Sequence, residues 1–174
     1  MNETLKTLME RRSCRAYEER QVEKAALEAI LEAGTYAPTG RGLQSPLIVA
    51  IRDPETIKRV ERLNAAVQGK PEGHPFYGAP TVVVVFGDPS LSFGIADGNL
   101  VIANILNAAP AVGVDSCYIW RARECFKSEE GKALKAAWGI PEGYEGVGNV
   151  ILGYGKPGSK RPAPPRKADY IRII

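Results

Sequence analysis

The most apolar segment of this 174-residue chain, from Leu91 to about Val112, restricts the fold more than any other feature. Its apolar residues leave almost no polar face, and its length suits a helix of several turns. A helix that is apolar on nearly all sides must be buried in a core or in a contact between subunits. We expect Pro110 to end or kink this helix. Both locations, core and interface, remain open from the sequence.

A run of four valines marks a second buried element, a strand from Thr81 to Phe86. Continuous apolar runs of this length are typical of strands covered on both faces. Shorter apolar runs predict three more strands, at residues 47–51, 112–120 and 147–154.

Helical spacing of apolar residues predicts four more helices, at residues 2–12, 22–33, 53–67 and 128–138. Gly34 is expected to end the second of these helices, and Asp53 and Ser128 to cap the next two. Together the elements predict one α+β domain over residues 1–155. Residues 156–174, rich in proline and basic residues, are expected to form an extended arm of the same domain.

The composition, with 44% hydrophobic and 25% charged residues, is that of a globular domain with a buried core. No apolar run is long enough to span a bilayer, and the first residues do not resemble a secretion signal. We therefore expect a cytoplasmic protein with no membrane partner.

The formal net charge of +3 comes from the C-terminal end of the chain. Six basic residues and one acidic residue follow Gly155, so residues 156–174 carry +5 and the rest carries −2. Such an arm could keep the chain in solution or bind a polyanion. A nucleic-acid-binding domain is one alternative, but the small net charge and the low aromatic content of 7% speak against it.

The three cysteines, Cys14, Cys117 and Cys125, form no CxxC motif, and His74 is the only histidine. A zinc site would therefore lack ligands, and a disulfide framework is improbable in a cytosolic chain. We expect the cysteines to be small buried hydrophobic residues. His74 lies in a predicted loop and is expected at the surface.

Three arginines and a hydroxyl lie close together just beyond the first predicted helix, at Arg11, Arg12, Ser13 and Arg15. Arginine binds phosphate through two parallel hydrogen bonds, and a serine hydroxyl or a backbone N–H adds a short one. The alternative is a solvated cationic helix end, which the helix dipole favours. Charge alone favours the alternative.

Three later segments combine glycine with polar or aromatic residues, at 37–46, 113–121 and 153–167. Each by itself also fits an ordinary role, as a connection, a core strand or a solubilising tail. The stiff Pro164–Pro165 pair is less expected in a floppy tail. None forms a catalytic triad, a Walker loop or a GxGxxG turn, so we predict no catalytic residue of these kinds.

Taken in order, these segments resemble the FMN-dependent nitroreductase family, and its short, clostridial-type branch in particular. Residues 11–17 look like its R-R-S-x-R-x-Y/F signature, and residues 37–44 like its A-P-S/T-G-x-N-x-Q loop. Residues 113–118 are similar to its G-x-x-S-C-W strand, and Gly153–Tyr154 to its G-Y-P turn. The resemblance implies a three-layer α+β fold with a central mixed sheet. It also implies a homodimer with two FMN molecules at the subunit interface and the helix at 91–112 in the dimer core.

The resemblance further implies which residues bind the flavin. Arg11, Arg12, Ser13 and Arg15 would contact its phosphate, ribityl chain or ring O2, and Arg166 and Lys167 its phosphate. The partner's copies of Thr39, Gly40 and Gln44 would meet the flavin, and Asn64 the pyrimidine edge of the ring. Ile119, Trp120 and Arg121 would face the ring near N5. Gly42, Ser45–Pro46 and Gly155 depart from the family pattern, so substrate choice does not transfer.

The function that the resemblance implies is hydride transfer from NADH or NADPH to nitroaromatics, quinones or similar electrophiles by a ping-pong mechanism. Flavin supplies the hydride chemistry, which fits the absence of a visible triad. Arg15 is our candidate for stabilising the reduced flavin. The alternative is a flavin-binding redox sensor or carrier with little turnover.

Overall fold

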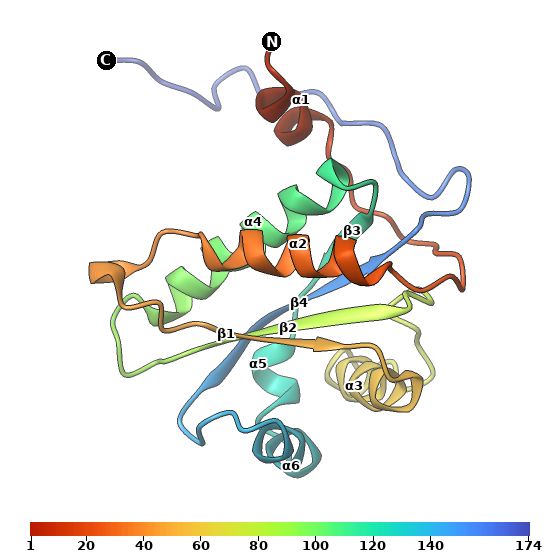
Figure 1. Cartoon of the computed structure of the whole chain (residues 1–174), viewed down its shortest axis with the longest axis vertical. Coiled ribbons are helices and arrows are strands. Elements are labelled where there is room, and N and C mark those ends of the chain that lie inside the picture. Colours follow the sequence, from red (N-terminus) through yellow and green to blue (C-terminus); the bar gives the residue numbers. More distant parts are fainter.

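A computed structural model of residues 1–174 places a four-stranded sheet between two layers of helices (Figure 1). The strands lie in the order β1-β2-β4-β3 and every neighbouring pair is antiparallel. Their bounds are Leu47–Ile51 for β1, Thr81–Gly87 for β2, Asp115–Ile119 for β3 and Glu145–Gly153 for β4. The expectation of a mixed sheet was therefore wrong. Strands β2 and β3 do run in the same direction, but β4 inserts between them and pairs antiparallel with both.

Two helix layers cover the sheet, with α2 and α4 on one face and α3, α5 and α6 on the other (Figure 1). The helices span Glu3–Glu10 (α1), Lys24–Thr35 (α2), Pro54–Val67 (α3), Gly94–Ala111 (α4), Ala122–Cys125 (α5) and Glu129–Ala137 (α6). A single 3₁₀ turn, η1, covers Gly40–Gly42. This arrangement confirms the predicted three-layer α+β architecture. The sequence did not predict α5 or η1, because three or four residues are too few to show a helical period.

Strand β2 is buried at all of its positions, as the valine run predicted. Its side chains alternate between the two layers, which is the period of an extended strand. Val83 and Val85 pack with α2 and α4, whereas Val84 and Phe86 pack with the opposite layer. The two faces of one strand thus hold together two separate hydrophobic clusters.

Helix α4 supplies part of the core, although one side of it stays accessible. Val101, Ile102 and Ile105 are buried, while Leu100 keeps 44% of its surface exposed. Pro110 lies in the last turn, and the helix ends one residue later. Gly34 does not end α2, as the sequence had suggested, but lies inside it. A Cβ at Gly34 would come within 2.8 Å of Ile105 Cγ1, so the glycine permits close contact between α2 and α4.

The two predicted N-caps are confirmed. The Asp53 side chain accepts a hydrogen bond from the Thr56 N–H at 2.8 Å, with Pro54 as the first helical residue. The Ser128 hydroxyl accepts from the Gly131 N–H at 3.1 Å. These side chains satisfy amide groups that the first turn of a helix leaves without partners.

The two ends of the chain meet beside β3, the edge strand. Ser13 forms an isolated bridge with Ser116 of β3, and Cys14 one with Lys160 of the C-terminal segment. Helix α1 has no buried residue, and everything after Lys160 is exposed. Figure 1 shows both termini on the same side of the molecule, beyond α4. None of the helices combines the length and the hydrophobicity that spanning a bilayer requires.

Candidate functional site

A cavity of about 670 Å³ lies between the N-terminal segment and the C-terminal arm. We call it the arginine cavity, because five of its lining residues are arginines. The complete lining is Leu8, Met9, Arg11, Arg12, Ser13, Arg15, Arg161, Pro162, Ala163, Pro164 and Arg166. The structure therefore brings together two basic segments that are about 150 residues apart in the chain.

The N-terminal wall of this cavity is fixed by backbone hydrogen bonds to β3 and to the arm. The Cys14 N–H donates to the Ser116 carbonyl at 3.0 Å, and the Arg15 N–H donates to the Ser159 carbonyl at 3.3 Å. One guanidinium nitrogen of Arg12 donates to the carbonyls of Met9 and Arg11, at 2.7 Å each. Arg12 thus closes the end of α1, while Arg15 stays exposed.

The C-terminal wall depends on Asp115, a residue that sequence reasoning did not single out for the site. One of its carboxylate oxygens lies 2.8 Å from Lys160 Nζ, and the other accepts from the Gly155 N–H at 3.0 Å. These two contacts hold the start of the arm against the first residue of β3. Beyond them the guanidinium of Arg166 donates twice to the Pro164 carbonyl, at 3.2 and 2.7 Å.

The arginine cavity is strongly cationic and has no internal neutralisation. None of its lining residues is acidic, and none of its five arginines takes part in a salt bridge. Guanidinium groups without counter-ions present several hydrogen-bond donors each. An anion with several oxygens, such as a phosphate or a carboxylate, is the ligand that this donor set matches.

A second constellation lies where β3 ends and α5 begins, at Ile119, Trp120 and Arg121. Two buried asparagine side chains hold this corner. The Asn149 amide donates to the Ile119 carbonyl at 3.1 Å, and the Asn64 amide donates to the Trp120 carbonyl at 2.7 Å. Both asparagines are completely buried.

The same corner has an uncommon backbone conformation. Arg121 has φ of 79°, in the left-handed region that side chains other than glycine rarely adopt. Its Nε donates to Asn64 Oδ1 at 3.1 Å, which ties the strained residue to the buried amide. The N–H groups of Trp120 and Arg121 donate no hydrogen bond within the chain. The corner therefore offers two free backbone donors from a rigid support.

The loop that contains Thr39, Gly40 and Gln44 lies elsewhere. The Gly40 N–H donates to both carboxylate oxygens of the buried Asp97, at 3.1 and 3.0 Å. The Thr39 hydroxyl accepts from the Gln44 N–H at 3.0 Å. Figure 1 shows η1 at the far end of α2 and α4, away from α1 and the arm. Within one chain these residues do not reach the arginine cavity.

Of the residues proposed from the sequence, Arg11, Arg12, Ser13, Arg15 and Arg166 gather at the arginine cavity. Ile119, Trp120, Arg121 and Asn64 gather at the corner. Asn64 is engaged with the corner through both ends of its amide. Lys167 does not line the arginine cavity and is exposed.

Sequence reasoning missed four residues that shape these sites: Arg161, Asp115, Asp97 and Asn149. Only Asn149 carried a local signal, since an asparagine within the apolar run 147–154 needs a buried partner. The other three depend on contacts between distant parts of the chain.

The cysteines and the histidine take no part in either constellation as reactive groups. All three cysteines are buried and unpaired, as predicted. Burial raises the pKa of the Cys125 thiol to about 11. Burial also raises the pKa of Cys117, although the hydroxyl of Ser13 and the charges of Arg15 and Arg11 act against it. Neither thiol is thus activated as a nucleophile. His74 is exposed, as predicted, with Nδ1 3.7 Å from Glu61 Oε2.

Comparison with known proteins agrees with this geometry. The model of the nitroreductase family matches residues 8–154. A protein of Archaeoglobus fulgidus named "Putative NADH dehydrogenase/NAD(P)H nitroreductase" is 32% identical over 161 residues, which cover 90% of this chain and 87% of that protein.

Two solved structures extend the likeness to the whole fold. A nitroreductase of Bacteroides fragilis with bound FMN is 30% identical, with a TM-score of 0.92 over 100% of both chains. A nitroreductase of Desulfitobacterium hafniense with bound FMN is 28% identical, with a TM-score of 0.89 over 100% of this chain and 99% of that chain. Because the family match extends from α1 to the end of β4, the chain belongs to the nitroreductase family.

Proposed function

We propose that this protein is an FMN-dependent oxidoreductase that transfers hydride from NADH or NADPH to small electrophiles such as nitroaromatics and quinones. The observation that carries the proposal is the arginine cavity, in which five arginines without salt-bridge partners, from both ends of the chain, line one space. Its volume lies within the usual range of small-molecule sites, about 300–1,000 Å³. The relatives with bound FMN support the choice of cofactor.

The residues present fit FMN. Its phosphate is a dianion, and Arg11 and Arg161 can neutralise it with charge-assisted hydrogen bonds. At the corner, the free N–H groups of Trp120 and Arg121 match hydrogen-bond acceptors such as those on the edge of a flavin ring. Asn64 and Asn149 hold these donors in place, so little reorganisation is needed when a ligand binds.

Bound FMN would supply the hydride chemistry, so the chain has to bind, orient and tune the cofactor and needs no acid or base of its own. In the proposed ping-pong cycle, the donor leaves before the acceptor binds at the same open face. Arg15 contributes positive charge that favours the reduced, anionic cofactor. The indole of Trp120, which belongs to the corner, is 65% exposed and so accessible to an acceptor that binds there.

The active unit in this proposal is a homodimer. Residues Thr39, Gly40 and Gln44 would then reach the cofactor held mainly by the partner. Helix α1 supports this arrangement, because it has no buried residue and its Leu5 and Leu8 are 50% and 49% exposed. The hydrophobic end of the arm, residues 170–174, is likewise exposed. Residues 156–174 act as an arm of the domain formed by residues 1–155.

The proposal is tested by the visible spectrum of the purified protein and by its response to each nicotinamide. The protein should be yellow, and NADH or NADPH should bleach it rapidly under anaerobic conditions. Added nitroaromatic or quinone should then restore the colour. A yellow protein that neither nicotinamide bleaches would be a flavin sensor or carrier, and a protein without affinity for FMN would refute both functions.

A further inference from the structure

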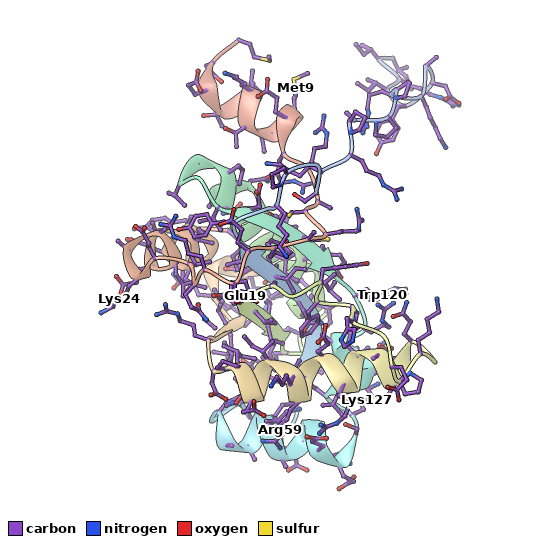
Figure 2. All side chains as sticks on the ribbon, turned by 90° about the vertical axis from the view of Figure 1, so that its right-hand side faces the viewer. Met9, Glu19, Lys24, Arg59, Trp120 and Lys127 are labelled. Carbon is purple, nitrogen blue, oxygen red and sulfur yellow. The ribbon has the colours of Figure 1, made fainter.

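A second cavity, of about 500 Å³, lies by α5 and α6, at the end of the molecule opposite to α1 and the arm (Figure 1). We call it the α5–α6 cavity, since these helices and the start of β4 form its walls. In Figure 2, Met9 marks the arginine cavity at the top and Lys127 marks the α5–α6 cavity lower down. The two spaces share no lining residue.

The α5–α6 cavity is basic. Four cations line it, Arg123, Lys127, Lys132 and Lys135, together with the carboxylates Glu142 and Glu145. The Glu145 carboxylate forms ion pairs with two of these cations. Its Oε2 lies 2.6 Å from Arg123 Nε, and its Oε1 lies 3.5 Å from Lys127 Nζ. The formal charge of the lining residues is +2, and Lys132 also pairs with Glu129 outside the cavity, with Nζ 2.7 Å from Oε1.

Lys135 is the most informative of these cations, because it is buried and lacks a carboxylate partner. Only 7% of its surface is exposed. Its ammonium donates to the Glu142 carbonyl at 2.9 Å and to the Tyr144 carbonyl, which leaves one of three protons without an acceptor in the chain. Burial lowers the pKa of Lys135, while the carboxylates of Glu142 and Glu145 act to raise it.

The remaining wall is apolar and firmly packed. Phe126 and Ile140, both buried, line the cavity beside Tyr144. Phe126 packs edge-on against Phe86 of the core, with ring centroids 4.9 Å apart, and against Trp138 at 5.7 Å. The cavity thus has a rigid aromatic floor and a cationic rim, which is the usual plan of a site for an amphipathic small molecule.

We infer that the α5–α6 cavity is a second binding site, which takes a small organic anion with a phosphate or carboxylate head and an aromatic or aliphatic body. The head group meets the ammonium of Lys135 and the cation of Lys127, and the body lies against Phe126 and Ile140. This site is independent of the proposed cofactor site, because it uses none of the same side chains.

The experiment uses the FMN-loaded protein, in which the cofactor's own phosphate site is filled, and isothermal titration with phenyl phosphate and with benzoate. At least one of these anions should bind, and more weakly at high salt. Benzyl alcohol, which has the same body without charge, and inorganic phosphate, which has no body, should each bind at least tenfold more weakly. The anion that binds more tightly identifies the head group.

Two variants locate the site. Lys135→Met should weaken binding of the preferred anion by about tenfold or more, since a charge-assisted hydrogen bond is lost. Lys127→Gln, at a more exposed position, should weaken it by about threefold and leaves the backbone contacts of Lys135 in place. Lys58→Gln, which removes a surface lysine on α3, should leave binding unchanged. A circular dichroism melt shows which variants are folded.

Three outcomes would overturn the inference. They are no binding of either anion by the wild-type protein, equal binding of benzyl alcohol, and equal binding by the wild type and Lys127→Gln. Each is independent of whether the protein reduces nitroaromatics, because FMN is already bound and no turnover is measured.

Discussion

The arginine cavity holds five arginines and no carboxylate, whereas the α5–α6 cavity balances four cations with two glutamates. The first is built from chain segments about 150 residues apart, and the second from a continuous stretch between Arg123 and Gly146. One cavity therefore depends on a long-range contact and has no carboxylate of its own beside its arginines. The other is local and is partly neutralised by its own chain. The arginine cavity thus has donors for an anionic ligand, as the proposed FMN phosphate requires.

The largest expected effect comes from removing the long-range half of the arginine cavity. Deletion of residues 160–174 should weaken FMN binding by about 100-fold or more, because two arginines at about 1.5–3 kcal/mol each and the Lys160 contact are lost. Quenching of flavin fluorescence measures the affinity.

Two double variants test whether the loss comes from the arginines of the cavity or from the charge of the arm in general. The double variant Arg161→Gln/Arg166→Gln should reproduce most of the loss, while Lys156→Gln/Arg172→Gln removes two charges from the arm outside the cavity and should have little effect. If the deletion binds FMN like the full chain, the arm has no role in the site.

The local half of the same cavity should show the next largest effect. Arg15→Ala should weaken FMN binding by about 10- to 100-fold, through loss of one charge-assisted contact. Because Arg15 is exposed and forms no salt bridge, the free energy of unfolding in urea should not change. Lys24→Ala, on an exposed surface of α2, is the control. Full retention of FMN by Arg15→Ala would contradict the assignment.

The corner between β3 and α5 separates the two cavities, and its buried amides provide a third test. Asn64→Ala should lower the free energy of unfolding by about 1–3 kcal/mol, since the Trp120 carbonyl and the Arg121 side chain lose their partner. The turnover number with a nitroaromatic should fall more than the affinity for FMN. An unchanged turnover number would show that the corner does not orient the cofactor.

Dimerisation can be tested without changing a lining residue of either cavity. Leu5→Glu places a charge on the exposed apolar face of α1 and should shift the protein to a monomer that holds FMN more weakly. Thr4→Glu, on the same helix, adds the same charge and should remain dimeric. Light scattering after gel filtration distinguishes the two, and a dimeric Leu5→Glu variant would exclude α1 from the interface.

The smallest expected effect is a pH dependence of the free energy of unfolding, which arises from Glu145 in the α5–α6 cavity. Burial acts to raise the pKa of Glu145, but Arg123 and Lys127 outweigh it and hold that pKa below its usual value. The contacts of Glu145 with Arg123 and Lys127 therefore stabilise the fold above about pH 4.5. This contribution is lost as the pH falls through the lowered pKa of Glu145.

Glu145→Gln should remove this contribution, which is below about 1 kcal/mol for a partly exposed pair. Urea unfolding of both proteins from pH 7 to pH 3 should show curves that converge in acid. At pH 7 the same variant leaves Arg123 and Lys127 unneutralised, so phenyl phosphate should bind a few-fold more tightly. Parallel curves over the whole pH range would show that the pair does not stabilise the fold.

The fold was predictable wherever a local signal decides the structure. The valine run gave β2, and Asp53 and Ser128 marked the starts of α3 and α6, because caps and apolar periods act over a few residues. Gly34 was misread, since its role is set by Ile105, a residue 71 positions away. The prediction of a mixed sheet was wrong for the same reason. β4 lies between β2 and β3 in the sheet although it follows both in the sequence, and no local signal marks this position.

The residues of the candidate site were likewise predictable only where a local signal or the family resemblance marks them. The arginines at 11–15 and Arg166 stood out by type and spacing, and the resemblance placed Asn64 and the corner in the site. Arg161, Asp115 and Asp97 did not stand out, because each gains its place from a partner in a distant segment. The strained φ of Arg121 is likewise visible only in the folded chain.

The sequence by itself determined which segments are buried, where helices begin, and that the excess positive charge lies near the C-terminus. Those properties follow from side-chain chemistry and short-range geometry. Only the tertiary structure decided that the C-terminal cations face the N-terminal arginines, and that the cations at 123–135 surround a separate cavity with an aromatic floor. The physical reason is that electrostatic neutralisation depends on distance in space, which the order of residues does not specify.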